Sequence, residues 1–355
     1  MRFHLSIIRP LLCLGLSWLA LTPGPVRAQF LFDATKAEMA GNADWVIDAD
    51  AHNLSVSSAS DGSGKLGGSE SNPQRTPTAA ASGITSTTAE TYWTGALSSW
   101  GVSLVQHGQS VETLPYNGAI TFGNASNAQD LSHYKVFVLA EPNIVFTAAE
   151  KVAILSFVQS GGGLFMISDH GTSDRNNDGK DSVGVWNDLM TNNTVKANPF
   201  GISFNGDNVS PTGSVTSSGS DPIIHGSIGG VTSFIYSNGS TMTLNTAQNS
   251  TVTGAVWSSS THTNSTVTVA YGTFGAGRFV AAGDSSPFDD GTGDPKDTLY
   301  KGWTDGTASG DDGRLAMNAS IWLSASAIVP VPEPGAAVLL AAGALPLLLR
   351  RKRRR

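Results

Sequence analysis

Acidic side chains stand directly after four apolar runs of this 355-residue sequence. In open α/β sheets, ligands bind beyond the carboxyl ends of the strands, so acids there could bind a cation, orient a base or activate water. If the four runs are neighbouring strands, these side chains would gather at one rim; alternatively, the strands simply end at polar residues. The side chains concerned are Asp33, Glu141, Asp169 with His170, and Asp284.

His170 is the natural candidate for a general base, because Asp169 beside it could orient the imidazole. Adjacent residues usually point in different directions, so the two side chains need not touch. Metal ligation and a purely structural histidine are the alternatives. We therefore take His170, Asp169 and Asp284 as candidate catalytic residues.

The segment that follows resembles the first half of a calcium loop. Asp174, Asn176 and Asp178 alternate and a glycine follows, which turns three oxygens toward one centre and allows a sharp bend. The twelfth position of an EF-hand would be Val185 rather than Glu, which excludes a standard EF-hand. Asp181 could close a smaller loop around a divalent cation, with calcium as the expected ion. The alternative is a surface loop whose Asx turns satisfy their own backbone.

Further polar residues could complete the same rim. Glu38, Asn42 and Asp44 follow the first apolar run and would either line the rim or cap a helix. Ser285 stands in a Gly-Asp-Ser sequence that invites comparison with Gly-Asp-Ser-type esterases. Those enzymes carry this block early and a histidine late, whereas here the block is late and no histidine follows it. Ser285 is therefore kept as a rim residue only.

The four apolar runs predict buried strands at residues 30–32, 134–139, 164–167 and 278–282. Continuous apolarity is typical of strands covered on both faces, as in a parallel sheet with helices on each side. The segment 267–271 would pair with the last run as a hairpin. The predicted fold class is α/β.

A helix is predicted between the second and third strands. Thr147 and Glu150 form a capping box, three glycines end the helix, and Val152, Leu155 and Val158 share a stripe expected to face the core. Strand, helix and strand make a right-handed βαβ unit. Further helices are predicted over residues 87–100 and 314–323.

Two segments differ from this pattern. Residues 53–86 are rich in Ser, Gly and Thr and poor in large apolar residues, which predicts a loop insertion. Residues 205–265 are rich in Ser, Thr and Asn with short β-prone pieces, which predicts a β-rich insertion or an edge sheet.

Both ends of the chain read as sorting signals. Residues 1–28 combine two early arginines, an apolar run and a small-residue cleavage site, which predicts a secretory signal peptide read by the Sec machinery. Residues 331–355 contain Pro332-Glu333-Pro334, then an uncharged, mostly apolar stretch at 335–349, then a cluster of five arginines and one lysine. The stretch is short for a helical span, and a simple tail anchor is the alternative to a specific signal.

The charge and cysteine counts apply to the body between these ends. Of the 21 Lys and Arg, 12 lie in residues 29–330, against 27 of the 28 Asp and Glu, so the body has a net charge of −15. An acidic body argues against nucleic-acid binding, which needs a basic stripe. The only cysteine is Cys13 in the signal, which excludes disulfides and thiolate chemistry in the body.

The C-terminal segment, with Pro332-Glu333-Pro334, a short span and a terminal arginine cluster in this order, resembles the PEP-CTERM sorting signal of Gram-negative bacteria. The resemblance implies recognition by an exosortase, removal of the tail, and delivery through the inner membrane to the outer surface or the extracellular matrix. Proteins with this signal commonly accompany exopolysaccharide production.

Residues 131–141, 146–150 and 157–167, with a later match at 277–286, resemble class I glutamine amidotransferase-like proteins. The resemblance implies a flavodoxin-like three-layer sandwich for residues 29–330. The family's nucleophilic Cys would occupy the turn Ser168–Gly171, which contains none, so glutaminase chemistry is excluded.

Two functions follow as expectations. The first is a non-catalytic, cation-stabilised binding or structural module of the cell surface, associated with exopolysaccharide and with polysaccharide as its partner. The second is a divalent-cation-dependent hydrolase of glycan or another envelope polymer, with the candidate residues above in its site.

Overall fold

A computed structural model describes residues 29–40, 43–48, 83–93, 95–293, 300–305 and 311–325 of the chain. The predicted signal peptide, most of the predicted loop 53–86, Asn42 and the predicted sorting signal at 331–355 lie outside these residues. In the described part, no helix combines the length and the apolar character needed to cross a membrane.

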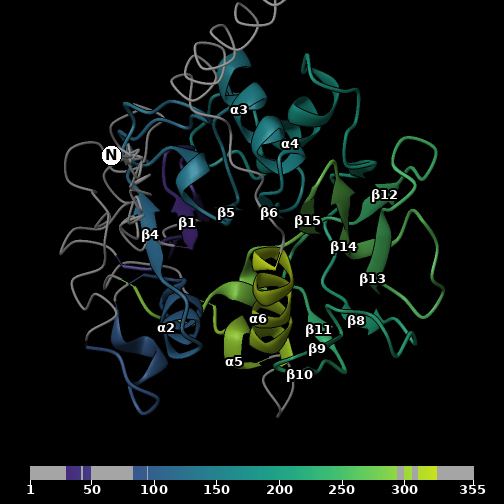
Figure 1. The fold of residues 1–355 in the computed structure, drawn as a ribbon. Coiled ribbons are helices and arrows are strands. Elements are labelled where there is room, and N and C mark those ends of the chain that lie inside the picture. Colours follow the sequence, from purple (N-terminus) through teal and green to yellow (C-terminus); the bar gives the residue numbers. More distant parts are fainter. Residues whose placement is uncertain are drawn as a thin grey trace, which may run out of the picture.

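Five parallel strands form the centre of the sheet (Figure 1). Along the sheet their order is β4-β1-β5-β6-β15, which in chain order is 2-1-3-4-5, the flavodoxin-like arrangement. The α/β prediction with a mainly parallel, flavodoxin-like sheet is confirmed. The strands are β1 (Phe30–Asp33), β4 (Val111–Leu114), β5 (Val136–Ala140), β6 (Gly163–Ile167) and β15 (Gly277–Ala282).

Antiparallel strands extend this sheet beyond β15. The predicted hairpin is present, because β14 (Val267–Phe274) pairs with β15 in antiparallel register. The Ser/Thr/Asn-rich segment supplies the outer strands of the same sheet, so it packs as a continuation of it. Beyond β14 lie β13 (Thr253–Trp257), β8 (Thr212–Val215) and β11 (Phe234–Ile235), with β12 (Met242–Leu244) and β7 (Ile202–Phe204) branching from β14.

Two small pairs stand apart from the main sheet. They are β2 (Met39–Ala40) with β3 (Ala43–Asp44), and β9 (His225–Gly226) with β10 (Gly229–Gly230). The first pair follows directly from the end of β1. It therefore belongs to the edge of the sheet where the predicted rim lies.

Helices cover both faces of the central sheet. Along β1, Phe30 and Phe32 pack into one core cluster and Leu31 into the other, as the alternation of a strand requires. The first cluster is closed by α2 (Ser98–Gln106) and α6 (Asp311–Ser324), with α5 (Gly302–Asp305) beside them, and the second by α3 (Ala148–Gln159) and α4 (Ser182–Thr191).

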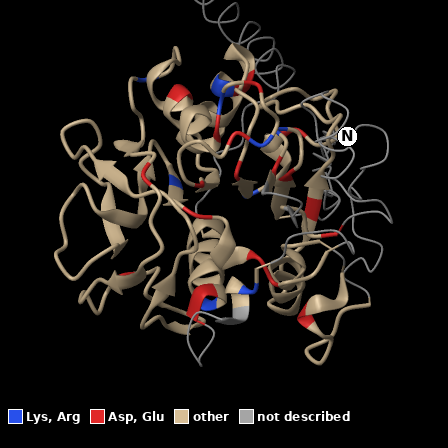
Figure 2. Cartoon of the chain, turned by 180° about the vertical axis from the view of Figure 1, so that it is seen from behind, with Lys and Arg blue, Asp and Glu red and all other residues tan. Residues whose placement is uncertain are grey.

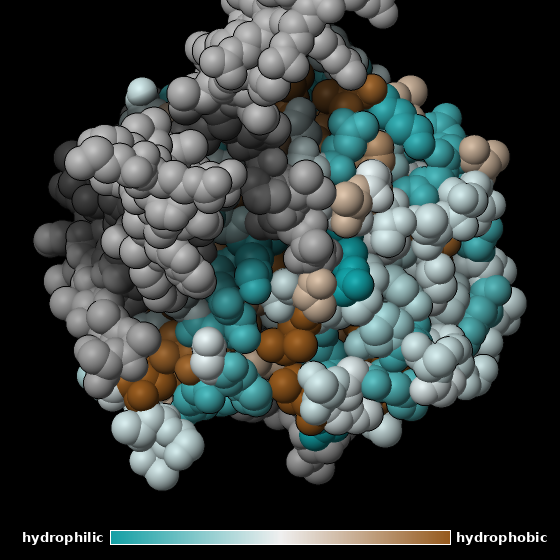
Figure 3. All heavy atoms as spheres, in the orientation of Figure 1, coloured by the Kyte–Doolittle hydropathy of each residue, from teal (hydrophilic) through white to brown (hydrophobic). Residues whose placement is uncertain are grey.

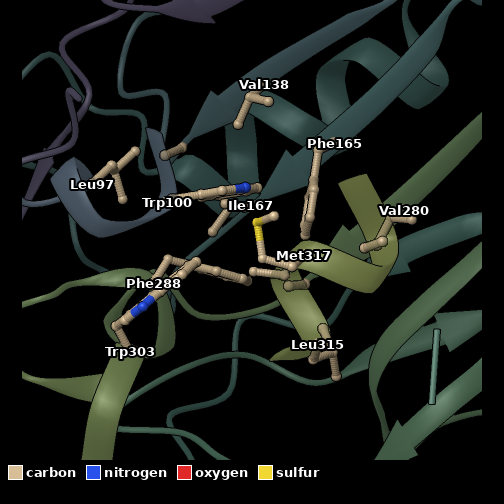
Figure 4. Packing of buried hydrophobic residues seen from close by; sticks show 14 of the residues in the cluster. Leu97, Trp100, Val138, Phe165, Ile167, Val280, Phe288, Trp303, Leu315 and Met317 are labelled. Carbon is tan, nitrogen blue, oxygen red and sulfur yellow. The ribbon is translucent and has the colours of Figure 1, made fainter. Parts of the chain in front are cut away.

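Aromatic rings fill the first of these layers. Trp100 stacks on Phe288 at 5.2 Å and meets Phe165 edge-on at 5.0 Å, with Trp303 beside it (Figure 4). Phe288 lies in the short helix η4 (Ser286–Phe288), directly after the end of β15. The core under α6 therefore also holds the turn that carries the last predicted rim residues.

The capping box of α3 is formed as predicted. Thr147 Oγ1 accepts from the Glu150 amide, and Glu150 Oε2 accepts from the Thr147 amide at 2.7 Å. The predicted buried stripe is wrong at Val152, which is 39% exposed, whereas Leu155 and Val158 are buried. Apolar residues lie almost all round this helix, so periodicity alone did not define the buried side.

The helix predicted over residues 87–100 is also wrong in its bounds. The segment holds only a short 3₁₀ turn, η2 (Glu90–Tyr92), and α2 begins at Ser98. Hydroxyl groups explain the late start, because Thr85 and Thr88 bond to one another through side chains and amides. Such local bonds compete with helix formation. The helix predicted over 314–323 is present within α6.

Candidate functional site

The rim at the carboxyl ends of the strands carries buried acids, as the sequence predicts. Asp33 ends β1, Glu141 follows β5, Asp169 follows β6 and Asp284 follows β15, and none is more than 3% exposed. Asp169 acts electrostatically on both Glu141 and Asp284, whereas the groups that act on Asp33 are Glu38, Lys36 and Glu150. The rim therefore consists of two clusters rather than one.

Arg175 joins the acids of the first cluster. Its Nε lies 3.0 Å from Glu141 Oε1 and its Nη2 lies 2.6 Å from Asp169 Oδ2. The two acid side chains are 0% and 5% exposed and the arginine side chain is 25% exposed. The backbone amide of Arg175 also donates to Asn143 Oδ1 at 3.2 Å. The loop between β6 and α4 thus folds its own guanidinium group onto the strand ends.

Both carboxylate oxygens of Glu141 accept hydrogen bonds from the chain itself. Its second oxygen, Oε2, accepts from Trp45 Nε1 at 2.8 Å and from Ser285 Oγ at 2.7 Å. Burial, and then the charge of Asp169, raise the pKa of Glu141 well above its usual range, although Arg175 opposes the shift. Glu141 also has a φ of +51°, a left-handed conformation that costs a non-glycine residue free energy.

His170 lies at the open side of Asp169. Its Nδ1 is 2.7 Å from the carbonyl oxygen of Gly171, which can only accept, so Nδ1 carries a hydrogen. Its Nε2 lies 3.9 Å from Asp169 Oδ2, beyond hydrogen-bond length. The side chain is 19% exposed. Among the described residues, Nε2 has no hydrogen-bond partner and is the rim atom best placed to act as a base or ligand.

Asp284 is fixed by its neighbours. Its Oδ2 accepts from the Ser237 amide at 2.5 Å, and its Oδ1 accepts from the Ser286 amide at 2.9 Å and from Ser286 Oγ at 2.8 Å. Burial first, and then the charge of Asp169, raise the pKa of Asp284 to about 8. The contacts tie the turn after β15 to residue 237, so Asp284 positions this edge rather than facing an open space.

Ser285 does not form a nucleophile arrangement. Its hydroxyl group donates to Glu141, and no histidine contacts it among the described residues. The side chain is 2% exposed. A substrate carbonyl has no path to it in this arrangement.

The predicted calcium loop is folded on its own backbone. Asp174 Oδ2 accepts from the Gly179 amide at 2.8 Å, and Asp178 Oδ1 accepts from the Lys180 amide at 2.9 Å. Asn176 Nδ2 donates to Asp178 Oδ2 at 3.0 Å. These are the contacts of Asx turns, the alternative that the sequence left open.

Asp181, the fourth predicted ligand, is the N-cap of α4. Its Oδ1 accepts from the Gly184 amide and its Oδ2 from the Thr172 amide, both at 2.7 Å. Over the described residues, no three or more His, Cys, Asp or Glu side chains are arranged to hold a metal ion. The oxygens suit calcium chemically, but they would have to turn away from the amides, so cation binding stays a prediction.

The remaining predicted rim residues lie elsewhere. Glu38 is fully buried beside Asp33 and does not line an opening. Asp44 lies in β3, and Asn42 is outside the described residues. Sequence reasoning missed Arg175, Trp45 and Asn143. The available signal was Arg175, a lone arginine in an acidic loop of an acidic body, where an unpaired buried acid needs a cation.

Comparison with known proteins assigns the chain to no family. No protein-family model matches the chain, and no curated protein matches it. Among solved structures, the chain is similar to the mmIFT52 N-terminal domain at 15% identity, covering 64% of this chain and 90% of that one, with a TM-score of 0.40.

Two further solved structures show the same level of similarity. They are a cytoplasmic protein, STM3548, from Salmonella typhimurium (15% identity, 62% and 83% coverage, TM-score 0.38) and a putative ThuA-like protein from Bacteroides uniformis (13%, 64% and 84%, TM-score 0.36). These scores are low, and no inference about function rests on them.

Proposed function

We propose that the protein is an exported, exosortase-sorted module of the cell surface or extracellular matrix, non-catalytic and associated with exopolysaccharide. The observation that carries the non-catalytic part is the Arg175 bridge. Arg175 contacts Glu141 and Asp169 at the strand ends, where an α/β enzyme would hold its substrate. The chain therefore uses these charges to hold itself together.

The other chemical groups of the rim support the same proposal. Ser285 and Asp284 are buried and bonded to the chain, and the carboxylates of the loop 174–181 cap backbone amides. A nucleophile, a base and an open position for a reacting atom are all needed for hydrolysis. Among the described residues only His170 Nε2 meets one of these needs.

The surface suits a polysaccharide matrix better than a nucleic acid or a membrane. The described chain carries few Lys and Arg, spread singly between acids (Figure 2). Over the antiparallel strands, on the right in Figure 3, the surface is weakly polar with little hydrophobic area. Exposed Ser and Thr hydroxyl groups there can exchange hydrogen bonds with sugar hydroxyl groups.

The proposed sorting to the cell surface rests on the C-terminal sequence. Pro332-Glu333-Pro334, the apolar stretch and the arginine cluster motivate sorting by an exosortase. The test is expression of the full chain in a Gram-negative host with and without its exosortase. We expect a shorter, surface-released product only with the exosortase, and replacement of all three residues by alanine to leave the tail uncut. Release without the exosortase would contradict the sorting proposal.

His170 favours a second candidate function, a divalent-cation-dependent hydrolase of glycan. Its Nδ1 contact to Gly171 leaves Nε2 with a lone pair when the ring is neutral. The two functions separate in one experiment on the full-length chain with the exopolysaccharide of the host. We expect retention on the polysaccharide without release of reducing ends, unchanged in His170→Ala. The hydrolase would be the correct function if the wild type releases reducing ends when calcium is added and His170→Ala does not.

A further inference from the structure

The second cluster of the rim is a pair of buried acids, Asp33 and Glu38. Asp33 is 1% exposed and Glu38 is 0% exposed, and each carboxyl group influences the pKa of the other. Neither lines an opening. Their chemistry therefore concerns the protein itself rather than a ligand.

Each carboxyl group of the pair has one oxygen that accepts a hydrogen bond from the described residues and one oxygen that does not. Asp33 Oδ2 accepts from Thr35 Oγ1 at 3.2 Å, and Glu38 Oε2 accepts from the Lys36 amide at 2.8 Å. The other two oxygens, Asp33 Oδ1 and Glu38 Oε1, are buried and receive no donor from any described residue. Ionised carboxylates only accept, so these oxygens would repel each other, whereas one proton between them satisfies both.

Few charges act on this pair. Lys36 lies nearby, but its Nζ is 2.7 Å from Glu150 Oε1 of α3 and is thus already neutralised. Directly after the neighbouring strand β5, Glu141 belongs to the Arg175 cluster. Burial raises the pKa of Asp33, and burial together with the charge of Asp33 raises the pKa of Glu38 well above its usual range. The surroundings thus favour a proton on the pair.

The pair holds the loop of residues 34–38, which in turn touches the first cluster. Glu38 fixes the Lys36 amide, and the Lys36 carbonyl accepts from the Asn143 amide at 2.7 Å. Asn143 Nδ2 donates to the carbonyl of Ala37 at 3.0 Å, while its Oδ1 accepts from the Arg175 amide. Ala37 has a φ of +54°, so the loop is strained and needs these contacts.

We propose that Asp33 and Glu38 share a single proton, and that this shared proton is a pH-sensitive latch that keeps the loop 34–38, and through Asn143 the Arg175 bridge, in place. Loss of the proton puts two negative charges side by side in a buried site. The loop then opens, and the contacts of Asn143 with both partners weaken. This inference does not depend on the proposed function.

Amide substitutions of the full-length chain test the latch. Glu38→Gln keeps an oxygen for the Lys36 amide and offers an NH₂ group to Asp33. The variant therefore has a hydrogen between the two side chains at every pH. The wild type should lose up to about tenfold in its folding equilibrium constant per pH unit relative to Glu38→Gln as pH rises above about 4, until the proton of the folded state is lost. Asp33→Asn should give the same result, because its NH₂ group would donate to Glu38.

The double variant, Asp33→Asn with Glu38→Gln, sharpens the test. It has no ionisable group at the pair, and because the Thr35 hydroxyl group can accept as well as donate, one amide oxygen can turn to accept from the NH₂ group of the other; the double variant should therefore also lack the wild-type pH slope. The matched control is Glu112→Gln on β4, a carboxylate whose donors are Tyr134 and Gln129 and which should keep the wild-type pH slope. Urea unfolding across pH gives all five curves.

Hydrogen exchange reads the connection to the first cluster. In the wild type, the protection factors of the Asn143 and Arg175 amides, which are already corrected for intrinsic exchange, should fall as pH rises. In Glu38→Gln, these protection factors should not fall with pH. The latch is refuted if Glu38→Gln or the double variant keeps the wild-type pH slope of stability. Equal protection of both amides in wild type and Glu38→Gln would refute the link to Arg175.

Discussion

Replacement of Arg175 by methionine tests the central claim that this side chain holds the rim together. Methionine fills a similar length of apolar volume but brings no charge and no donor. Glu141 Oε1 and Asp169 Oδ2 would each lose a charge-assisted bond, at 3.0 and 2.6 Å. Both acids remain buried, so water cannot replace the lost donors fully.

The size of the loss follows from these contacts. Each bond to a charged group is worth about 1.5–3 kcal/mol, which gives roughly 3–6 kcal/mol for two. The arginine side chain is 25% exposed, so solvent screening reduces this figure to about 2–4 kcal/mol. For a domain of this size, a loss of about 2–4 kcal/mol lowers the melting temperature by about 4–8 °C.

The loss should also depend on pH. Without Arg175, the strongest influence that opposes burial is lost and only the Ser285 hydrogen bond still lowers the pKa of Glu141, so this pKa rises further above its value in the unfolded chain. A raised folded-state pKa gives stability that is complete below the unfolded pKa and disappears as pH rises through the folded pKa. Arg175→Met should therefore be hurt least in mild acid and most at neutral to alkaline pH.

Thermal melting across pH, with two companion variants, decides the matter. Arg175→Lys keeps the charge but cannot bridge both acids, so it should fall between wild type and Arg175→Met. Glu141→Gln added to Arg175→Met should recover part of the loss, because it removes one buried uncompensated charge. If Arg175→Met melts like the wild type at every pH, the bridge does not hold the rim and the non-catalytic argument loses its basis.

Other predictions follow from single contacts. Since burial raises the pKa of Asp284 to about 8, its contribution to stability is complete below about pH 4 and is lost as pH rises through about 8, which urea midpoints across pH will show. Thr147→Ala removes the capping box of α3 and should cost about 1 kcal/mol in chemical denaturation, whereas exposed Val152→Thr should change stability by less than about 0.5 kcal/mol. Gly283→Ala would place its Cβ 1.8 Å from the carbonyl oxygen of Ser240 and should cost about 3 kcal/mol or more, seen as loss of soluble folded protein; a well-folded variant would contradict the packing at the end of β15.

Much of the fold could be predicted because its signals are local. Continuous apolar runs marked four of the five central strands, and Thr147 with Glu150 marked the start of α3. The fifth strand, β4, was not predicted, because Glu112 and Thr113 interrupt its apolar residues. The failures came where tertiary packing decides. Val152 is on an exposed side of a helix that is apolar almost all round, and hydroxyl groups near Thr85 delay the start of α2. Neither effect has a period that a sequence pattern would show.

The site could be predicted only as far as its acids. Strand ends placed Glu141, Asp169 and Asp284 at one rim, because parallel strands end at a common edge. Sequence could not tell whether the acids face a ligand or the chain, since that depends on where the loop after β6 folds back. Trp45 and Arg175 answer this from positions 96 and 34 residues away from Glu141 in the sequence.

The two clusters of the rim solve the same electrostatic problem in different ways. Around Glu141 and Asp169, a guanidinium group supplies the charge and the donors that burial demands. Around Asp33 and Glu38 the nearest cation, Lys36, is paired with Glu150, and in our proposal a shared proton supplies the missing donor. Asn143 contacts both arrangements, through the loop 34–38 on one side and the Arg175 amide on the other. A rise in pH that leaves Arg175 charged can therefore still weaken its contacts, because it removes the proton shared by Asp33 and Glu38.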